Sequence, residues 1–575
     1  MGKEPVYRWS DSTVIAPLIN HWPAWSYLIS PAAASLHLLD YQLKTMRSYL
    51  QDPESHVRAC KDPELIGGPF MDIEPGRAGD VRRLLAETER MQRGNQELAR
   101  AIIDAYSLLA DQAQGQELES FYPKLPYRLR GYVELVYDYY NHPVVRMLEG
   151  LLYESEYYDA RLQSLKISRP ERDNSRPFFM STPCLDCDDE IDWAKPFNDP
   201  QADWLFSLDV EPQPLGIIRE TLGLSEKDEP RLMPMLSQGP ASPPEKWQGA
   251  DVRIRYFGHA CVLAEWRGIS ILTDPFVSAM PTGGGIERLT YRDLPAKIDY
   301  ALVTHNHCDH FVLETLLRLR HRIGHLVVPR SFGLLHGDVS LKLMCRQLGF
   351  KNVIEMDTLE RIELGDGKIV AVPFLGEHGD LPHAKTAYVV RAGNQAMMFA
   401  ADSNCLDRHM YERVRDCVGD IETVFLGTES VGAPLSWSYG PLFPRKPSHG
   451  VNQSRRQRGC DAARALDLLE AVGARRVYNY GMGQEPWLEH ILALGLTEDS
   501  PQICESDKLL AEARRRGFIA AERLFGKREF YLEESAGEPR RPSLGVPRTG
   551  EDQESFDDRP SLASEVNDAE DTFVF

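Results

Sequence analysis

Apolar residues in the first 245 positions recur mainly at helical spacings. Between 81 and 112 they fall three or four positions apart, which predicts amphipathic helices with one buried stripe. A tyrosine-rich stretch from 127 to 165 is also predicted to be helical, with its aromatic rings in the core. Neither stretch carries a chemical motif. We therefore expect a mostly helical or α+β N-terminal domain, residues 1–245, that serves dimerisation or partner recognition.

The pattern changes after a proline-rich stretch. Five prolines crowd among polar residues between 225 and 250, which predicts a linker. Short apolar runs then alternate with helical segments, which predicts an α/β domain over 246–533. Helices are expected at 312–320 and 460–472. The predicted strands are 252–256, 261–266, 269–273, 300–304, 326–328, 369–374, 396–400, 423–426 and 476–478.

Charge and composition disfavour several classes of binding partner. The net charge of −21 disfavours nucleic acid and anionic membranes. The chain has no apolar run of about 18 residues and no apolar segment at its start, so we expect neither a membrane span nor a secretory signal. Ten cysteines suit a reducing cytoplasm, and the Cys184-x-x-Cys187 pair lacks the second pair of a zinc site. Residues 534–575 are predicted to be a disordered acidic tail.

The densest chemistry is His305-x-His307-x-Asp309-His310, directly after a predicted strand. Histidines two positions apart in extended backbone can converge on one ion, while Asp309 and His310 point toward a second ion nearby. Imidazole and carboxylate suit zinc, iron or manganese. Four ligand-type residues within six positions predict a dinuclear metal site.

This motif resembles the His-x-His-x-Asp-His signature of the metallo-β-lactamase superfamily, over about 251–483. The resemblance implies an αββα sandwich. It makes Asp274 a residue that orients the ligand loop, and it makes His259 structural rather than a ligand. Asp402, after the strand predicted at 396–400, is a further ligand candidate because its carboxylate can bridge two ions.

The chain departs from the hydrolases of that superfamily in two places. The hydrolases end their ligand set with a histidine on a late strand, but no histidine stands between 477 and 487, and His490 follows within a predicted helix. The expected third-ligand segment carries Glu377 beside His378. Hard oxygen ligands stabilise oxidised iron. The carboxylate-rich set therefore favours iron, with zinc as the alternative.

With these departures the chain resembles the metallo-β-lactamase-fold diiron β-hydroxylase family of nonribosomal peptide and antibiotic pathways, chloramphenicol biosynthesis among them. The resemblance implies an O2-dependent monooxygenase that acts on an aminoacyl thioester held by a peptidyl carrier protein and draws on an external electron donor. The metal ligands that it implies are His305, His307, Asp309, His310, Glu377 and Asp402. His305, His307 and Glu377 would bind one iron, and His310 and Asp402 the other, with Asp309 beside them.

Two further groups carry hypotheses about catalysis. Glu429 follows another predicted strand and joins Glu377 as a candidate catalytic residue, where it either binds a substrate amine, relays protons or is only structural. Trp437 and Tyr439, in a Pro/Gly-rich loop over 434–447, can form a substrate wall or lid.

Arg455, Arg456 and Arg458 form a basic run in an acidic chain. The run is either a solvated loop or a dock for an acidic carrier protein and its phosphopantetheine phosphate. The runner-up function is a dizinc hydrolase of the same fold that acts on an ester, amide or phosphodiester. A homodimer is compatible with the sequence.

Overall fold

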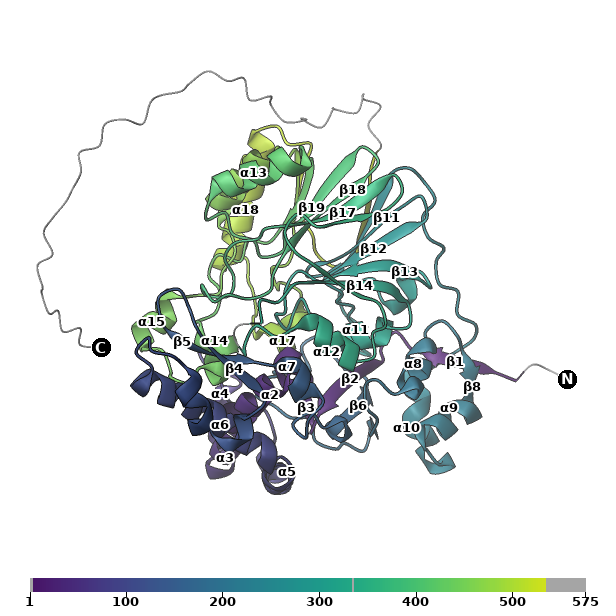
Figure 1. The fold of residues 1–575 in the computed structure, drawn as a ribbon. Helices are drawn as coiled ribbons and strands as arrows, with labels where there is room; N and C mark the ends of the chain where they lie inside the picture. The colour runs from purple at the N-terminus through teal and green to yellow at the C-terminus, as the bar shows by residue number, and fades with distance from the viewer. Residues whose placement is uncertain (1–3, 334–335, 534–575) are drawn as a thin grey trace, which may run out of the picture. The chain divides into compact units, whose positions relative to one another are not determined.

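Two seven-stranded β-sheets stacked face to face form the C-terminal half of the computed structural model, which describes residues 4–333 and 336–533 (Figure 1). The first sheet has the order β15 (Val353–Met356), β14 (Ile323–Pro329), β13 (Ile298–Leu302), β12 (Ile269–Thr273), β11 (Cys261–Trp266), β10 (Val252–Gly258) and β23 (Arg528–Leu532). The second has the order β16 (Arg361–Glu363), β17 (Gly367–Val372), β18 (Ala387–Ala392), β19 (Gln395–Phe399), β20 (Thr423–Leu426), β21 (Arg476–Asn479) and β22 (Ala520–Arg523).

Helices cover the outer face of each sheet. The first sheet is covered by α11 (Leu313–Leu319) and α12 (Leu341–Gln347), and the second by α13 (Arg408–Val418), α16 (Ala462–Val472) and α18 (Pro501–Arg515). The αββα sandwich expected from the sequence is confirmed. Side chains alternate along each strand. Val262 of β11 therefore packs between the sheets, whereas its neighbour Leu263 packs on the outer face.

Parallel strands bring the metal-facing loops together. In the first sheet β12 to β15 are parallel, and in the second β19 to β22 are parallel. The carboxyl ends of parallel strands lie at one edge of a sheet. The loops that follow β12, β13, β19 and β20 carry Asp274, the His305–His310 motif, Asp402 and Glu429, which places these residues at that edge.

The N-terminal region combines small sheets with helices. Its strands are β1 (Val6–Trp9) with β8 (Gln213–Pro214) and β9 (Leu236–Gln238), β2 (Val14–Ile19) with β3 (Trp22–Pro23), β6 (Gln163–Ser168) and β7 (Ile191–Trp193), and the hairpin of β4 (Val133–Tyr137) and β5 (Pro143–Met147). Its helices are α1 (Ser26–Ile29), α2 (Pro31–His37), α3 (Leu43–Gln51), α4 (Pro53–Ala59), α5 (Ala78–Met91), α6 (Arg93–Gln112), α7 (Glu149–Tyr153), α8 (Pro200–Ser207), α9 (Leu215–Leu222) and α10 (Glu229–Leu232). Its buried residues are continuous with the outer face of the first sheet, so the two regions share one core.

Two predictions for this region are wrong in part. Helices α5 and α6 are confirmed at 81–112, but most of 127–165 is not helical, because the β4–β5 hairpin buries Val133, Leu135, Val145 and Met147 at a period of two. The tip tyrosines of the hairpin are exposed rather than in the core. Residues 226–238 of the predicted linker form short helices and strand β9, whereas 239–250 hold no helix or strand.

The remaining predictions on domain limits stay predictions. The tail at 534–575 lies outside the described residues. Over the described residues, no helix is both long enough and apolar enough to cross a membrane.

Candidate metal centre

Two groups of buried ligand-type side chains meet at the strand-end edge of the sandwich. Within each group the ligand atoms lie within 4.8 Å of one another. The first group is His305, His307, Glu377 and Asp402, and the second is His259, Asp309 and His310. Asp402 Oδ2 lies 3.5 Å from His305 Nε2 and 3.0 Å from His310 Nε2, so this carboxylate joins the groups. The structure thus brings together all six residues that the sequence indicated.

Asp274 holds the histidine loop in place, as the sequence led us to expect. Its Oδ1 accepts a hydrogen bond from the backbone N–H of Thr304 at 2.7 Å. Its Oδ2 accepts from Thr304 Oγ1 and from His310 Nδ1, both at 2.8 Å. Because Nδ1 of His310 donates to Asp274, Nε2 is the ring nitrogen that faces Asp402, and it becomes a metal ligand once it has given up its proton.

His305 and His307 are oriented in the same way. Thr304 Oγ1 donates to Asp274 and so accepts from His305 Nδ1 at 3.0 Å, which directs His305 Nε2 to the centre. His307 places Nδ1 2.9 Å from Glu377 Oε1 and Nε2 2.6 Å from the hydroxyl of Tyr439. The two histidines therefore offer opposite ring nitrogens to the same side of the site.

The side chains of the adjacent residues Glu377 and His378 point toward different partners. Glu377 has φ 70° and points its carboxylate at His307. His378 instead contacts the Tyr439 hydroxyl through Nδ1, with its ring centroid 4.5 Å from that of His307. This geometry is compatible with the predicted ligand role of Glu377, which stays a prediction.

His259 is where the structure departs from the sequence analysis, which treated it as structural. It lies at the turn between β10 and β11 with φ 51°, and its Nε2 is 2.8 Å from Asp309 Oδ2 and 3.3 Å from His310 Nε2. Glu485, from the late segment that lacks a histidine, accepts from the backbone N–H of His259 at 3.3 Å. Sequence reasoning missed both contacts, and only the turn signal Gly258-His259 after a strand pointed to them.

Unpartnered polar atoms in the first group show that its side chains fit a bound cation. His305 Nε2, Glu377 Oε2 and Asp402 Oδ1 are buried and have no hydrogen-bond partner among the described residues. Burying such atoms unpaired costs free energy unless a metal ion takes them up. The seven histidine and carboxylate side chains of the two groups, with one carboxylate between the groups, have the chemistry that suits iron. Positive φ angles at His259, Asp274 and Glu377 add backbone strain, which tends to persist at functional sites.

Charges in the site shift the pKa values of its acids and bases. Burial alone would lower the pKa of His310, but the carboxylates of Asp402, Asp309 and Asp274 raise it well above its ordinary value. Burial raises the pKa of Glu429 well above its ordinary value, and the negative charges of Asp402 and Glu377 add to the rise. The Glu429 carboxyl therefore interacts electrostatically with the carboxylates of Asp402 and Glu377.

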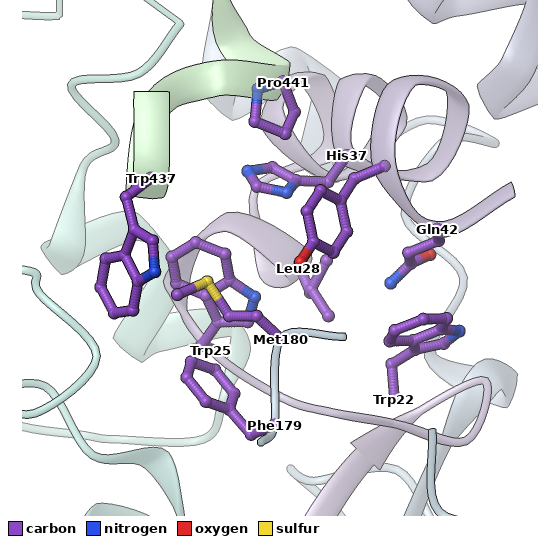
Figure 2. Close-up of a pocket in the computed structure, with 10 residues that line it drawn as sticks. Trp22, Trp25, Leu28, His37, Gln42, Phe179, Met180, Trp437 and Pro441 are labelled. Carbon is purple, nitrogen blue, oxygen red and sulfur yellow. The ribbon is translucent and has the colours of Figure 1, made fainter. Parts of the chain in front are cut away.

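Trp437 and Tyr439 join the centre to the N-terminal region. Both lie on α14 (Ser436–Tyr439). Tyr439 is buried against His307, while Trp437 donates through Nε1 to the carbonyl of Gly67 at 3.2 Å. Figure 2 shows Trp437 lining a pocket with Trp25, Phe179 and other N-terminal residues. Its volume of about 10 Å³ holds roughly one water molecule. The pocket is too small for an aromatic substrate side chain.

Comparisons with known proteins agree with this geometry. The model of the family described as diiron non-heme beta-hydroxylase N-terminal domain matches residues 8–240, and that of the beta-lactamase superfamily domain matches 270–478. The 4-amino-L-phenylalanyl-[CmlP-peptidyl-carrier-protein] 3-hydroxylase of Streptomyces venezuelae is 36% identical over 538 residues, which cover 92% of this chain and 100% of that protein. The crystal structure of CmlA, a diiron beta-hydroxylase from Streptomyces venezuelae, matches with a TM-score of 0.85 and 34% identity over 92% of this chain and 100% of that one.

Proposed function

Because this chain belongs to the diiron non-heme β-hydroxylase family, we propose that it β-hydroxylates an aminoacyl group tethered as a thioester to a peptidyl carrier protein, in a nonribosomal peptide or antibiotic pathway. The similar enzyme from Streptomyces venezuelae is named for such a carrier-bound substrate. The observation that carries the proposal is the carboxylate of Asp402 shared between two buried ligand groups. The comparisons favour this function over the dizinc hydrolase.

The proposal gives each residue of the centre a role. His305, His307, Glu377 and Asp402 would hold one iron, and His310 and Asp309, with His259 and the shared Asp402, the other. When bound, the iron pair supplies the reductive activation of O2 and the oxidation of the C–H bond. Overall, O2, two electrons and two protons convert the C–H bond to C–OH and release one water. An external donor must supply the electrons.

The protein residues orient groups and move protons. Asp274 orients the ring of His310 and Thr304 that of His305, while the hydroxyl of Tyr439 contacts Nε2 of His307 and holds its ring in place. Glu429, which faces the ligand carboxylates, is the candidate to bind the substrate amine or to carry a proton. The proposal includes a cytoplasmic location, which suits ten free cysteines. The homodimer stays a prediction.

The test supplies purified protein with iron, a reductant and O2. Mass spectrometry then compares an aminoacyl-loaded carrier with the free amino acid. We expect one added oxygen on the carrier-bound group and none on the free amino acid. Equal rates of oxygen insertion on both substrates would refute the hypothesis that the substrate must be carrier-bound. Hydrolysis without oxygen insertion would favour the dizinc hydrolase.

A further inference from the structure

We propose that residues 430–460, the basic segment, form the docking surface for the carrier protein, with Arg445 and Arg458 as its main contacts. This inference rests on the carrier-bound substrate of the proposed function. The segment contains five Lys and Arg residues and no Asp or Glu, in a chain with 86 acidic residues among 575. A local excess of positive charge on such an acidic protein attracts an acidic partner to that place.

The basic segment runs along the loops that carry the metal-facing side chains. Arg455 Nε donates to the carbonyl of Gly379 at 2.9 Å, two residues beyond Glu377. The backbone N–H of Gly459 donates to the carbonyl of Glu429 at 2.9 Å. The hydroxyl of Tyr439, also in this segment, contacts His307. A partner bound to the outer side of the segment is thus held beside the metal centre.

The basic side chains of the segment divide into two kinds. Arg455 and Arg456 are half-buried and hold loops, since Arg456 Nε donates to the carbonyls of Val431 and Gly432 at 2.9 Å. Lys446 pairs with Asp40. These contacts make the Arg455–Arg456 pair a fixed part of the fold. Of the basic run that the sequence offered as a dock, only Arg458 is therefore available to a partner, and Arg445 joins it.

Arg445 and Arg458 are exposed, and their side chains have no hydrogen-bond or ion-pair partner within the described part of the chain. Their guanidinium groups are free to bind anions. The backbone of Arg458 is nevertheless anchored, because its carbonyl accepts from Asn404 Nδ2 at 3.4 Å. Because the backbone of Arg458 is already held, binding has to restrict only the freedom of its side chain.

A carrier protein fits this surface on two grounds. Carrier proteins are commonly acidic, and charge complementarity raises the rate of association. Their phosphopantetheine arm carries a phosphodiester, which arginine binds well. His305, Glu377 and Asp402 are at most 4% exposed, so a substrate must reach them on a slender tether. Docking at the segment would start that tether close to the centre.

The experiment measures binding without turnover. The probe is the phosphopantetheine-bearing CmlP carrier domain, labelled for fluorescence anisotropy, titrated with full-length protein at low and physiological salt. The test variant is Arg445→Glu/Arg458→Glu. The matched control is Lys351→Glu/Arg475→Glu, which reverses two exposed charges just before the parallel strands β15 and β21, at the edge opposite the centre.

For the wild-type protein we expect a Kd that rises with salt. The test variant should bind about tenfold more weakly at low salt and lose most of the salt dependence, whereas the control should stay within about twofold of wild type. Wild-type affinity in the test variant, or failure of the wild-type protein to bind the carrier at low salt, would overturn the docking surface.

A second readout separates this inference from the proposed function. The test variant should still hydroxylate a small aminoacyl-pantetheine thioester at the wild-type rate, because its metal centre is intact. Oxygen insertion on the loaded carrier together with unchanged binding by the variant would refute the docking surface alone. Oxygen insertion only on the free amino acid would refute the proposed function.

Discussion

Buried charged groups behave differently in two regions of this protein. Where the N-terminal region joins the first sheet, each guanidinium nitrogen of Arg318 of α11 has a partner. Nε and Nη2 donate to Asp209 at 2.7 and 2.8 Å, and Nη1 donates to the carbonyl of Thr13 at 2.7 Å. At the metal centre, Asp402 and Glu377 are equally buried, yet each keeps an oxygen without a protein partner among the residues described.

The buried charges of Arg318 and Asp209 at the join are paired with each other, whereas those at the metal centre serve to bind a ligand. Removing one partner of a buried ion pair strongly destabilises the fold, because it leaves the other charge buried without compensation. Unpaired buried carboxylates destabilise the metal-free protein and are retained because a ligand will satisfy them. Substitutions at the join should therefore change unfolding, and substitutions at the centre should change metal content.

Replacing the shared carboxylate should have the largest effect. Asp402→Ala removes the residue that touches both ligand groups, so we expect both irons to be lost while the fold persists. Iron analysis and circular dichroism, measured on one preparation, check this. Asp416→Ala, which removes an exposed carboxylate that pairs with Arg413 on the surface, is the control. Two irons per chain in the Asp402 variant would end the assignment.

The adjacent residues Glu377 and His378 test which side chain at the centre binds iron. Glu377→Ala should lose iron because its carboxylate faces His307 Nδ1. His378→Ala should keep most of its iron because its Nδ1 faces the Tyr439 hydroxyl instead. The two variants differ by one position, so each controls for the other. Greater loss of iron from the His378 variant would show that the ligand register is displaced by one residue.

At the join, Arg318→Met should lower the free energy of unfolding by about 3 kcal/mol, because it leaves the carboxylate of Asp209 buried without a partner. Urea unfolding measures this change. Iron content per folded chain should stay near the wild-type value. The double variant Arg318→Met/Asp209→Asn removes the stranded charge and should recover part of the loss. Equal stability of the single variant and wild type would contradict the comparison.

Glu149 of α7 gives the smallest effect, because it is buried at the join but only half satisfied. Its Oε2 accepts from the backbone N–H of Ser340 at 2.9 Å, and burial raises the pKa of its carboxyl to about 7. The folded state therefore holds this proton at pH values where the unfolded state has lost it. Stability should fall by about 1 kcal/mol as the pH rises from about 6 to about 8.

The check is thermal or urea unfolding of wild type and Glu149→Gln across that range. The glutamine cannot ionise, so its stability should depend less on pH through this window. Parallel pH profiles for the two proteins would show that Glu149 does not cause the fall in stability.

The sequence predicted best where signals are local. The strand pattern after 250 and the dense His305–His310 motif follow from neighbouring residues, because a strand end and the turn after it are set within a few positions. The β4–β5 hairpin was misjudged because tyrosines fit either period. What fixed it as a hairpin was the burial of Leu135 and Val145 on one face.

Contacts between segments far apart in the chain could not be predicted from the sequence. His259 lies against Asp309 because strand pairing brings the β10–β11 turn to the edge where β13 ends. Tyr439 reaches His307 from 132 positions away. At Glu377, with φ 70°, the backbone turns so that the carboxylate faces His307. Sequence alone determined which residue types were offered at each strand end. Packing of the two sheets and the shared core determined which of them face one another, because side-chain direction depends on backbone angles that distant contacts hold in place.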